Sequence, residues 1–192
     1  MLRESTTRLP ERINEGKTIM KASELMNKYC VNQLGYVVED VQEACETFTN
    51  AFGAGPFFIM TPPPMAKTIF RGKEVENAIE VAYGMYGDLQ IELIKPLTAG
   101  PTPYTEKGIG FNHFSVWVDD FDQAVKDWEE AGYEVAMYME SSQGLRVAYI
   151  DCLKDLGQYV EIHNPQPFLI DKCKEARDAW DGTSAVVEMK MG

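Results

Sequence analysis

The sequence predicts an α+β fold in which two paired βαβββ modules form one curved, mixed-sheet cup. The first observation is a duplication: residues 33–40 (QLGYVVED) align with residues 113–120 (HFSVWVDD). The second is that each copy leads into an amphipathic stretch with helical spacing. The third is that a glycine- and proline-rich stretch at 98–110 separates the copies, as a linker would. A duplicated unit with polar residues in equivalent places indicates a pseudo-symmetric site between its halves.

The repeat and the composition on either side of it divide the chain into three parts. A chain of 192 residues is long enough for one full core built from two units. The expected parts are an N-terminal extension at 1–30, a domain at 31–165 with modules at 31–97 and 111–165, and a helical tail at 166–192.

The first module is expected to begin with a strand at 33–38, and Asp40 then starts a helix as its N-cap. Gly53 ends this helix. Apolar residues recur along it at helical spacing, namely Val41, Ala44, Cys45, Phe48, Ala51 and Phe52. The other strands of the module are expected at about 57–61, 66–71, 77–86 and 89–94.

The second module repeats this plan, with a strand at 112–118, a helix capped by Asp120, and Gly132 at the helix end. The apolar side of its helix consists of Phe121, Ala124, Val125, Trp128 and Ala131. Strands are expected at about 134–139, 145–151 and 157–163, and one tail helix at about 170–180.

The faces of the strands place four polar residues together. Side chains alternate across a strand, and the face that is apolar throughout must meet the amphipathic helix. The other face carries Gln33 in the first strand and His113 in its copy. Glu92 and Glu161 stand opposite apolar residues in the last strand of each module. If the two sheets face each other as a cup, these four residues converge inside it.

The chemistry of these residues fits a divalent cation. Two carboxylates in a partly buried cup repel each other, and one of them would have to take up a proton. A bound ion removes this conflict. One imidazole, two carboxylates and one amide oxygen, with two positions left open, suit octahedral Zn²⁺, Mn²⁺, Co²⁺, Ni²⁺ or Mg²⁺. A single glutamate would be interpreted as an ordinary solvent-facing residue, but four aligned positions across a duplication favour one divalent metal ion.

Composition excludes several classes of partner. The net charge of −12 argues against nucleic acid, whose phosphates this surface would repel. No apolar run approaches the roughly 20 residues that a membrane helix needs, and the N-terminus lacks the apolar region of a signal peptide. The four cysteines show no CxxC spacing and are expected to be reduced thiols. A cytoplasmic location is therefore expected.

At these residues the sequence resembles the vicinal oxygen chelate superfamily, which includes glyoxalases, bleomycin-resistance proteins and extradiol dioxygenases. The resemblance covers about residues 31–165, and Trp180-Asp181-Gly182 also resembles the end of the uncharacterised glyoxalase-like branch. The recognisable pieces are residues 33–40, Gly55-Pro56-Phe57-Phe58, residues 112–120 and Tyr159-Val160-Glu161.

The resemblance implies a metal site, because members of the superfamily bind one metal in a cup of paired modules. Their ligands lie at the start of the first strand and in the last strand of each module. Carried over, these positions are Gln33, Glu92, His113 and Glu161, the same four that the strand faces select. Epimerases of the superfamily usually have histidine at the first position, from which Gln33 departs. A dioxygenase needs two histidines and one carboxylate for Fe(II), which would require His163 as a substitute.

Four further residues are candidate substrate-binding residues. Trp117 and Tyr159 face the cup, either as walls of an aromatic pocket or as core packing. His163 shares the face of Glu161 and is either a proton shuttle or extra ligand, or a partly exposed residue at a strand end. Arg146 lies on a neighbouring strand and can pair with a substrate carboxylate or with Asp151.

The expected function is that of a metal-dependent lyase or isomerase acting on a small carbonyl compound. The metal would stabilise an enediolate, while Glu161 or Glu92 carries the proton. The alternatives are a non-catalytic protein that sequesters an apolar small molecule and an Fe(II) extradiol-type dioxygenase. A homodimer with a small-molecule substrate is expected.

Overall fold

The computed structural model describes residues 20–189, so most of the expected 1–30 extension and the last three residues of the tail lie outside the described part. The helices are α1 (Ala22–Lys28), α2 (Val41–Phe52), α3 (Pro103–Lys107), α4 (Phe121–Glu130), α5 (Leu153–Leu156) and α6 (Pro167–Asp178). The strands are β1 (Val31–Val37), β2 (Phe58–Met60), β3 (Lys67–Phe70), β4 (Lys73–Glu74), β5 (Ile79–Tyr86), β6 (Leu89–Pro96), β7 (Gly110–Trp117), β8 (Val135–Glu140), β9 (Arg146–Cys152) and β10 (Gln158–His163).

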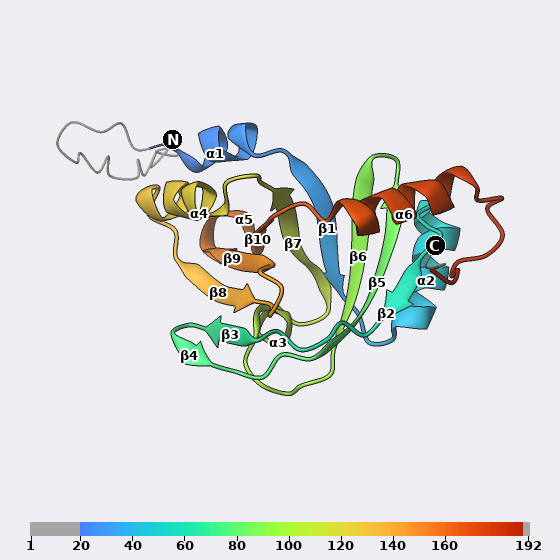
Figure 1. Cartoon of the computed structure of the whole chain (residues 1–192), viewed down its shortest axis with the longest axis horizontal. Coiled ribbons are helices and arrows are strands. Elements are labelled where there is room, and N and C mark those ends of the chain that lie inside the picture. Colours follow the sequence, from blue (N-terminus) through green and yellow to red (C-terminus); the bar gives the residue numbers. More distant parts are fainter. Residues whose placement is uncertain (1–19, 190–192) are drawn as a thin grey trace, which may run out of the picture.

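The described strands form one ten-stranded curved sheet in the order β2-β5-β6-β1-β7-β10-β9-β8-β3-β4 (Figure 1). β1, β6, β5 and β2 make the first module, and β7, β10, β9 and β8 make the second in the same internal order. The modules meet where β1 pairs antiparallel with β7. The predicted α+β fold, with two modules around a curved mixed sheet, is confirmed.

The β3–β4 hairpin differs from the predicted arrangement, in which the strand at 66–71 belongs to the sheet of the first module. β3 instead pairs with β8, at the far edge of the second module. Residues 62–64 are all proline and cannot donate backbone hydrogen bonds, so the chain leaves the sheet after β2. Because its two ends connect to β2 and β5, this hairpin links the two outer edges of the sheet.

The duplicated helices α2 and α4 pack on the outer faces of the modules, opposite the cup. Each begins at the predicted aspartate. The Asp40 side chain accepts from the Glu43 N–H at 3.0 Å, and the Asp120 side chain accepts from the Gln123 N–H at 3.0 Å. The core under α2 includes the buried residues Val41, Cys45, Ile91 and Leu93, and the core under α4 includes Phe121, Ala124, Trp128, Ile150 and Val160.

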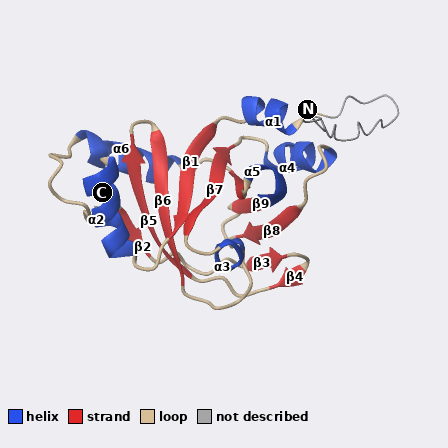
Figure 2. Cartoon of the chain, turned by 180° about the vertical axis from the view of Figure 1, so that it is seen from behind, coloured by secondary structure: helices blue, strands red, loops and turns tan. Residues whose placement is uncertain are grey.

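Two helices lie outside the repeated plan. In α1 the fully buried Leu25 joins the Trp128 core, so the end of the expected extension packs on the second module. α6 lies on the face of β5 and β6 that is opposite to α2, as the two views show (Figures 1 and 2). There Cys173 packs against Phe58 and Met85. The division at residues 30 and 166 stays a prediction. Among residues 20–189, no helix is long and apolar enough to cross a membrane.

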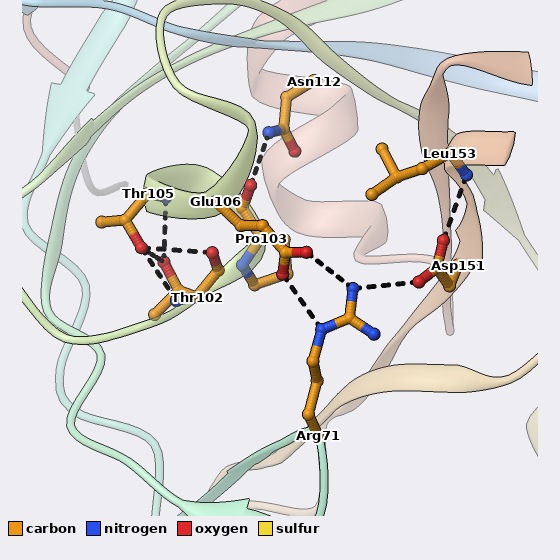
Figure 3. A network of polar contacts seen from close by, with 8 residues as sticks. All are labelled: Arg71, Thr102, Pro103, Thr105, Glu106, Asn112, Asp151 and Leu153. Atoms are coloured by element: carbon orange, nitrogen blue, oxygen red, sulfur yellow. Dashed lines mark hydrogen bonds and ion pairs between the residues drawn. The ribbon is translucent and has the colours of Figure 1, made fainter.

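The predicted linker contains the short helix α3, which an ion-pair network connects to both modules (Figure 3). Arg71, in the turn of the β3–β4 hairpin, donates from Nε and Nη2 to the two oxygens of Glu106 at 3.0 and 2.8 Å. Arg71 Nη2 also donates to Asp151 Oδ2 at 2.9 Å. The network therefore joins the hairpin, α3 and β9 at one point.

Candidate metal centre

The strand register arranges the cup face around β1 and β7 in two rows. One row crosses β6, β1 and β7 as Glu92, Gly35 and His113, which are register partners. In the neighbouring row Gln33 is the register partner of both Gln90 and Ser115, and Ser115 is the partner of Glu161. Register partners project from the same face of a sheet, so all these residues face the cup. Residues far apart in the sequence thus reach one location.

Three potential ligand atoms meet in this arrangement. His113 Nε2 lies 3.2 Å from Glu92 Oε2 and 3.5 Å from Glu161 Oε2. The ligand atoms of Glu92, His113 and Glu161 all lie within 4.8 Å of one another. Exposed fractions are 6% for each glutamate and 0% for His113. Ligands about 2.1 Å from one ion and at right angles to each other are roughly 3 Å apart, so these separations suit a shared cation.

Unpaired buried atoms support the same fit. Glu92 Oε2, His113 Nε2 and Gln33 Oε1 are buried without a hydrogen-bond partner. The Gln33 amide donates through Nε2 to Gln90 Oε1 at 2.8 Å, which leaves its oxygen free. Buried polar atoms without partners are costly, and a cation held by the clustered ligand atoms would satisfy those of Glu92 and His113. The donor set is therefore compatible with a divalent metal ion.

Opposite charges in the centre stabilise the ionised forms of His113 and Glu161. Burial alone disfavours the imidazolium, yet the charges of Glu161 and Glu92 raise the pKa of His113 above its ordinary value. Burial also works against ionisation of Glu161, but His113 and His163 hold the pKa of its carboxyl below its ordinary value. A proton on His113 thus balances the carboxylates, a role that a cation would take over.

The packing of His113 depends on a glycine. A Cβ built on Gly35 would lie 1.9 Å from His113 Cε1 and 2.2 Å from Nε2. On the other side the His113 ring meets the Tyr149 ring edge-on, with centroids 5.1 Å apart. The sequence reasoning missed this role of Gly35. The signal was present, because a glycine inside a strand often marks a close approach.

Of the four predicted substrate-binding residues, the structure brings Tyr159 and His163 next to the ligand residues His113 and Glu161. Tyr159 is fully buried as the register partner of His113, and its hydroxyl has no hydrogen-bond partner. Trp117 is half-buried, with its ring 6.1 Å from that of His163. His163 is 7% exposed, so the expectation of a partly exposed histidine is wrong. Its Nε2 lies 3.8 Å from Glu161 Oε2, and its Nδ1 donates to the Asn164 carbonyl at 2.7 Å.

Arg146 is not brought to the cup. Along β9, Val147 and Tyr149 belong to the cup-side core, whereas Ala148 and Ile150 belong to the core under α4. Arg146 lies on the α4 side, where it donates to Asp122 at 2.6 Å and covers the Phe121 ring at 4.5 Å. It does not pair with Asp151, whose partner is Arg71.

Aromatic and methionine side chains surround the centre on the cup side. Tyr104 and Tyr149 are buried, and their hydroxyls lie 2.9 Å apart. Burial, together with the nearby charges of Glu92 and Glu161, raises the pKa of both phenols, so they remain protonated. A groove of about 550 Å³ lies elsewhere, between α6 and the tail, and none of the three ligand residues lines it. The buried cup, and not this groove, holds the reactive groups.

Comparison with known proteins agrees with this architecture. Residues 32–149, more than half of the chain, match the family model described as the Glyoxalase/Bleomycin resistance protein/Dioxygenase superfamily. A comparison with curated protein sequences gave no match. A hypothetical protein from Bacillus halodurans C-125 is 14% identical, with a TM-score of 0.50 over 71% of this chain and 94% of the other.

A second similar structure is the methylmalonyl-CoA epimerase from Mycobacterium tuberculosis. It is 18% identical, with a TM-score of 0.47 over 73% of this chain and 91% of the epimerase. Similarity at this level concerns the fold and not the reaction. On the family match, the chain belongs to the glyoxalase, bleomycin resistance protein and dioxygenase superfamily.

Proposed function

We propose that this protein is a metal-dependent isomerase or lyase that moves a proton next to the carbonyl group of a small molecule. The observation that carries the proposal is the buried group of Glu92, His113 and Glu161, contributed by three strands of a pseudo-symmetric cup. The superfamily includes enzymes, and perturbed carboxyl and imidazole groups in one place are typical of active sites. A purely structural core would have little reason to bury two carboxylates and two histidines together.

Gln33, Glu92, His113 and Glu161 would hold one divalent ion, for which zinc, manganese, nickel, cobalt and magnesium are the candidates. The mixed oxygen and nitrogen donors suit these ions. The unpaired Gln33 Oε1 is the atom that would join the three clustered ligand atoms. When bound, such an ion would polarise a substrate carbonyl and lower the pKa of the neighbouring C–H group.

Glu161 is the proposed base. Its lowered pKa keeps it ionised and therefore able to accept a proton. His163 would receive that proton in turn. Its Nδ1 donates to a backbone carbonyl, which leaves Nε2, 3.8 Å from Glu161 Oε2, as the acceptor. Glu92, related to Glu161 by the duplication, would serve a proton on the opposite side of the substrate. Two such groups would let a proton leave one face of the substrate and return on the other.

Exchange of substrate protons with solvent tests this assignment. Candidate α-hydroxy or α-substituted carbonyl compounds are incubated with metal-loaded protein in D₂O, and exchange is followed by NMR. Glu161→Gln and Glu92→Gln keep the shape and one oxygen ligand but remove a base, so at least one should lose exchange while it keeps its fold and some metal. Glu80→Gln, which changes a half-buried strand carboxylate paired with Lys95, serves as the control. Exchange that persists unchanged in both site variants contradicts the assignment.

A non-catalytic binding protein is the second candidate. The cup-side core, with Tyr104, Tyr149, Tyr159 and several methionines, would offer an apolar ligand aromatic and adaptable side chains. Tight binding of an apolar compound by protein that takes up no metal would favour sequestration.

Oxygen consumption with a catechol in the presence of Fe(II) would favour the dioxygenase. The homodimer and the cytoplasmic location stay predictions, and sedimentation tests the first.

A further inference from the structure

A buried amide fixes which nitrogen of His113 faces the centre. The Pro103 carbonyl on α3 accepts from Asn112 Nδ2 at 3.0 Å (Figure 3). Because a carbonyl can only accept, this bond sets the orientation of the amide and directs Oδ1 away from α3. Asn112 Oδ1 lies 3.2 Å from His113 Nδ1. The oxygen also can only accept, so Nδ1 donates to it. The second proton of the imidazolium lies on Nε2, which faces the carboxylates of Glu92 and Glu161 and is the nitrogen left for a metal once that proton is lost.

A second chain of hydrogen bonds ends at Gln33. The Tyr83 carbonyl accepts from the Cys173 thiol of α6 at 3.9 Å, and Cys173 Sγ accepts from Gln90 Nε2 at 3.7 Å. Gln90 Oε1 then accepts from Gln33 Nε2 at 2.8 Å. Each donor and acceptor is used once along the chain. Gln33 Oε1 is the atom left over, buried and without a partner.

Burial makes both orientations costly to reverse. Asn112 and Cys173 are 0% exposed and Gln90 is 2% exposed, so water does not replace a lost bond. Rotating the Asn112 amide by half a turn would bring its oxygen against the Pro103 carbonyl and leave Nδ1 of His113 without its acceptor. A buried group that is left without its hydrogen bond destabilises the arrangement that leaves it so.

We propose that Asn112 and Gln90 are positioning residues, which orient His113 Nε2 and Gln33 Oε1 toward the proposed metal. The inference rests on the proposed function in so far as it names a metal. It has a structural consequence, because each chain of bonds includes an element outside the duplicated modules. α3 supports the ligand of the second module, and α6 supports that of the first. Outer groups of this kind orient metal ligands, and their loss typically lowers metal affinity about 10- to 100-fold.

The tautomer of His113 in the metal-free protein tests the first series of hydrogen bonds, from Pro103 through Asn112 to His113. Long-range ¹H–¹⁵N NMR of the full-length protein, at a pH where the ring is neutral, distinguishes Nδ1–H from Nε2–H. We expect Nδ1–H in the wild type and in Asn112→Asp, which keeps an acceptor. We expect a shift toward Nε2–H in Asn112→Leu. Asn32→Leu is the matched control, because the Asn32 side chain accepts from the Trp117 N–H on the same sheet and is not a member of either series of hydrogen bonds.

An Nε2–H ring in the wild type, or an unchanged tautomer in Asn112→Leu, overturns the proposal for Asn112. The wild-type measurement stands even if Asn112→Leu fails to fold. It also stands if the protein binds no metal, so failure of the proposed function and failure of this inference are distinguishable.

Zinc titration of the chelator-treated protein tests the second series of hydrogen bonds, from Tyr83 through Cys173 and Gln90 to Gln33. Gln90→Met keeps the length of the side chain but removes the acceptor for Gln33, and we expect Zn²⁺ affinity to fall by about 10- to 100-fold. Gln90→Glu keeps that acceptor and should retain more affinity than Gln90→Met. Asn32→Leu should bind Zn²⁺ as the wild type does. Equal affinities of Gln90→Met and the wild type, or equal losses in Gln90→Met and Asn32→Leu, overturn the role of Gln90.

Discussion

Replacing Gly35 by alanine should displace the His113 ring and weaken metal binding. The added Cβ would lie 1.9 Å from His113 Cε1, whereas ordinary contact begins at 3.4 Å, so the two groups must separate by 1.5 Å (3.4 minus 1.9). Gly35 has an extended backbone that alanine can adopt, so the effect is steric. Shifts of about 1 Å at a reacting centre can cost roughly 100-fold in rate. Overpacking should also destabilise the fold by about 1–3 kcal/mol.

Gly84→Ala is the matched control for this prediction. Gly84 lies in β5 on the α2 side of the sheet, and its Cβ would lie 2.7 Å from Phe57 Cδ1. Both variants should lose stability in urea unfolding, but only Gly35→Ala should lose Zn²⁺ or Mn²⁺ affinity by calorimetric titration. Wild-type stability and metal affinity in Gly35→Ala would refute the reasoning. Equal loss of metal affinity in both variants would show that affinity falls with overall stability and not with displacement of His113.

Three further predictions follow from the contacts. In metal analysis, His113→Ala should lose bound metal almost entirely and His163→Ala should retain most of it. The reason is that His163 aligns with Ile94 in the repeat and lies outside the group of Glu92, His113 and Glu161. Equal losses of metal in the two variants would make His163 a ligand. For Asp127, burial opposes ionisation, but bonds from Lys28, Tyr29 and Gln123 lower its folded pKa. The stability that the Asp127 carboxylate contributes is therefore present above the ordinary aspartate pKa and is lost as pH falls through the lower folded value. The unfolding free energies of wild type and Asp127→Asn, measured in urea, should converge at low pH. A difference between them that grows on acidification would contradict this assignment. Arg71→Leu should speed proteolytic cleavage in the β3–β4 hairpin, by gel analysis, with little change in metal affinity; an unchanged cleavage rate would show that the ion pairs do not hold the hairpin.

The fold was predictable where sequence periodicity was strong. The helix caps Asp40 and Asp120 and the alternation in β1 and β7 were sufficient to define two modules. Alternation in β6, β7 and β10 placed Glu92, His113 and Glu161 on the cup face. In these elements local pattern and tertiary structure agree, because a strand with one apolar face can be buried in only one way.

The rest depended on tertiary contacts that no local pattern encodes. Strand β3 has ordinary strand character, and only its pairing with β8 shows to which edge it belongs. Arg146 looked available in the sequence, but the side of β9 from which it projects sends it toward Asp122. The bonds that orient His113 and Gln33 join residues on different elements, such as Gln90 and Cys173, which are separated by 83 positions.

Metal analysis of the purified protein tests the central claim most directly. After purification without chelators, or after exposure to Zn²⁺, Mn²⁺ or Ni²⁺ and removal of the excess, elemental analysis should find close to one divalent ion per chain. The same treatment of His113→Ala, with its fold verified by circular dichroism, should leave almost none. A folded wild-type protein that retains no divalent ion, or a His113→Ala variant that retains as much as the wild type, would contradict the metal centre.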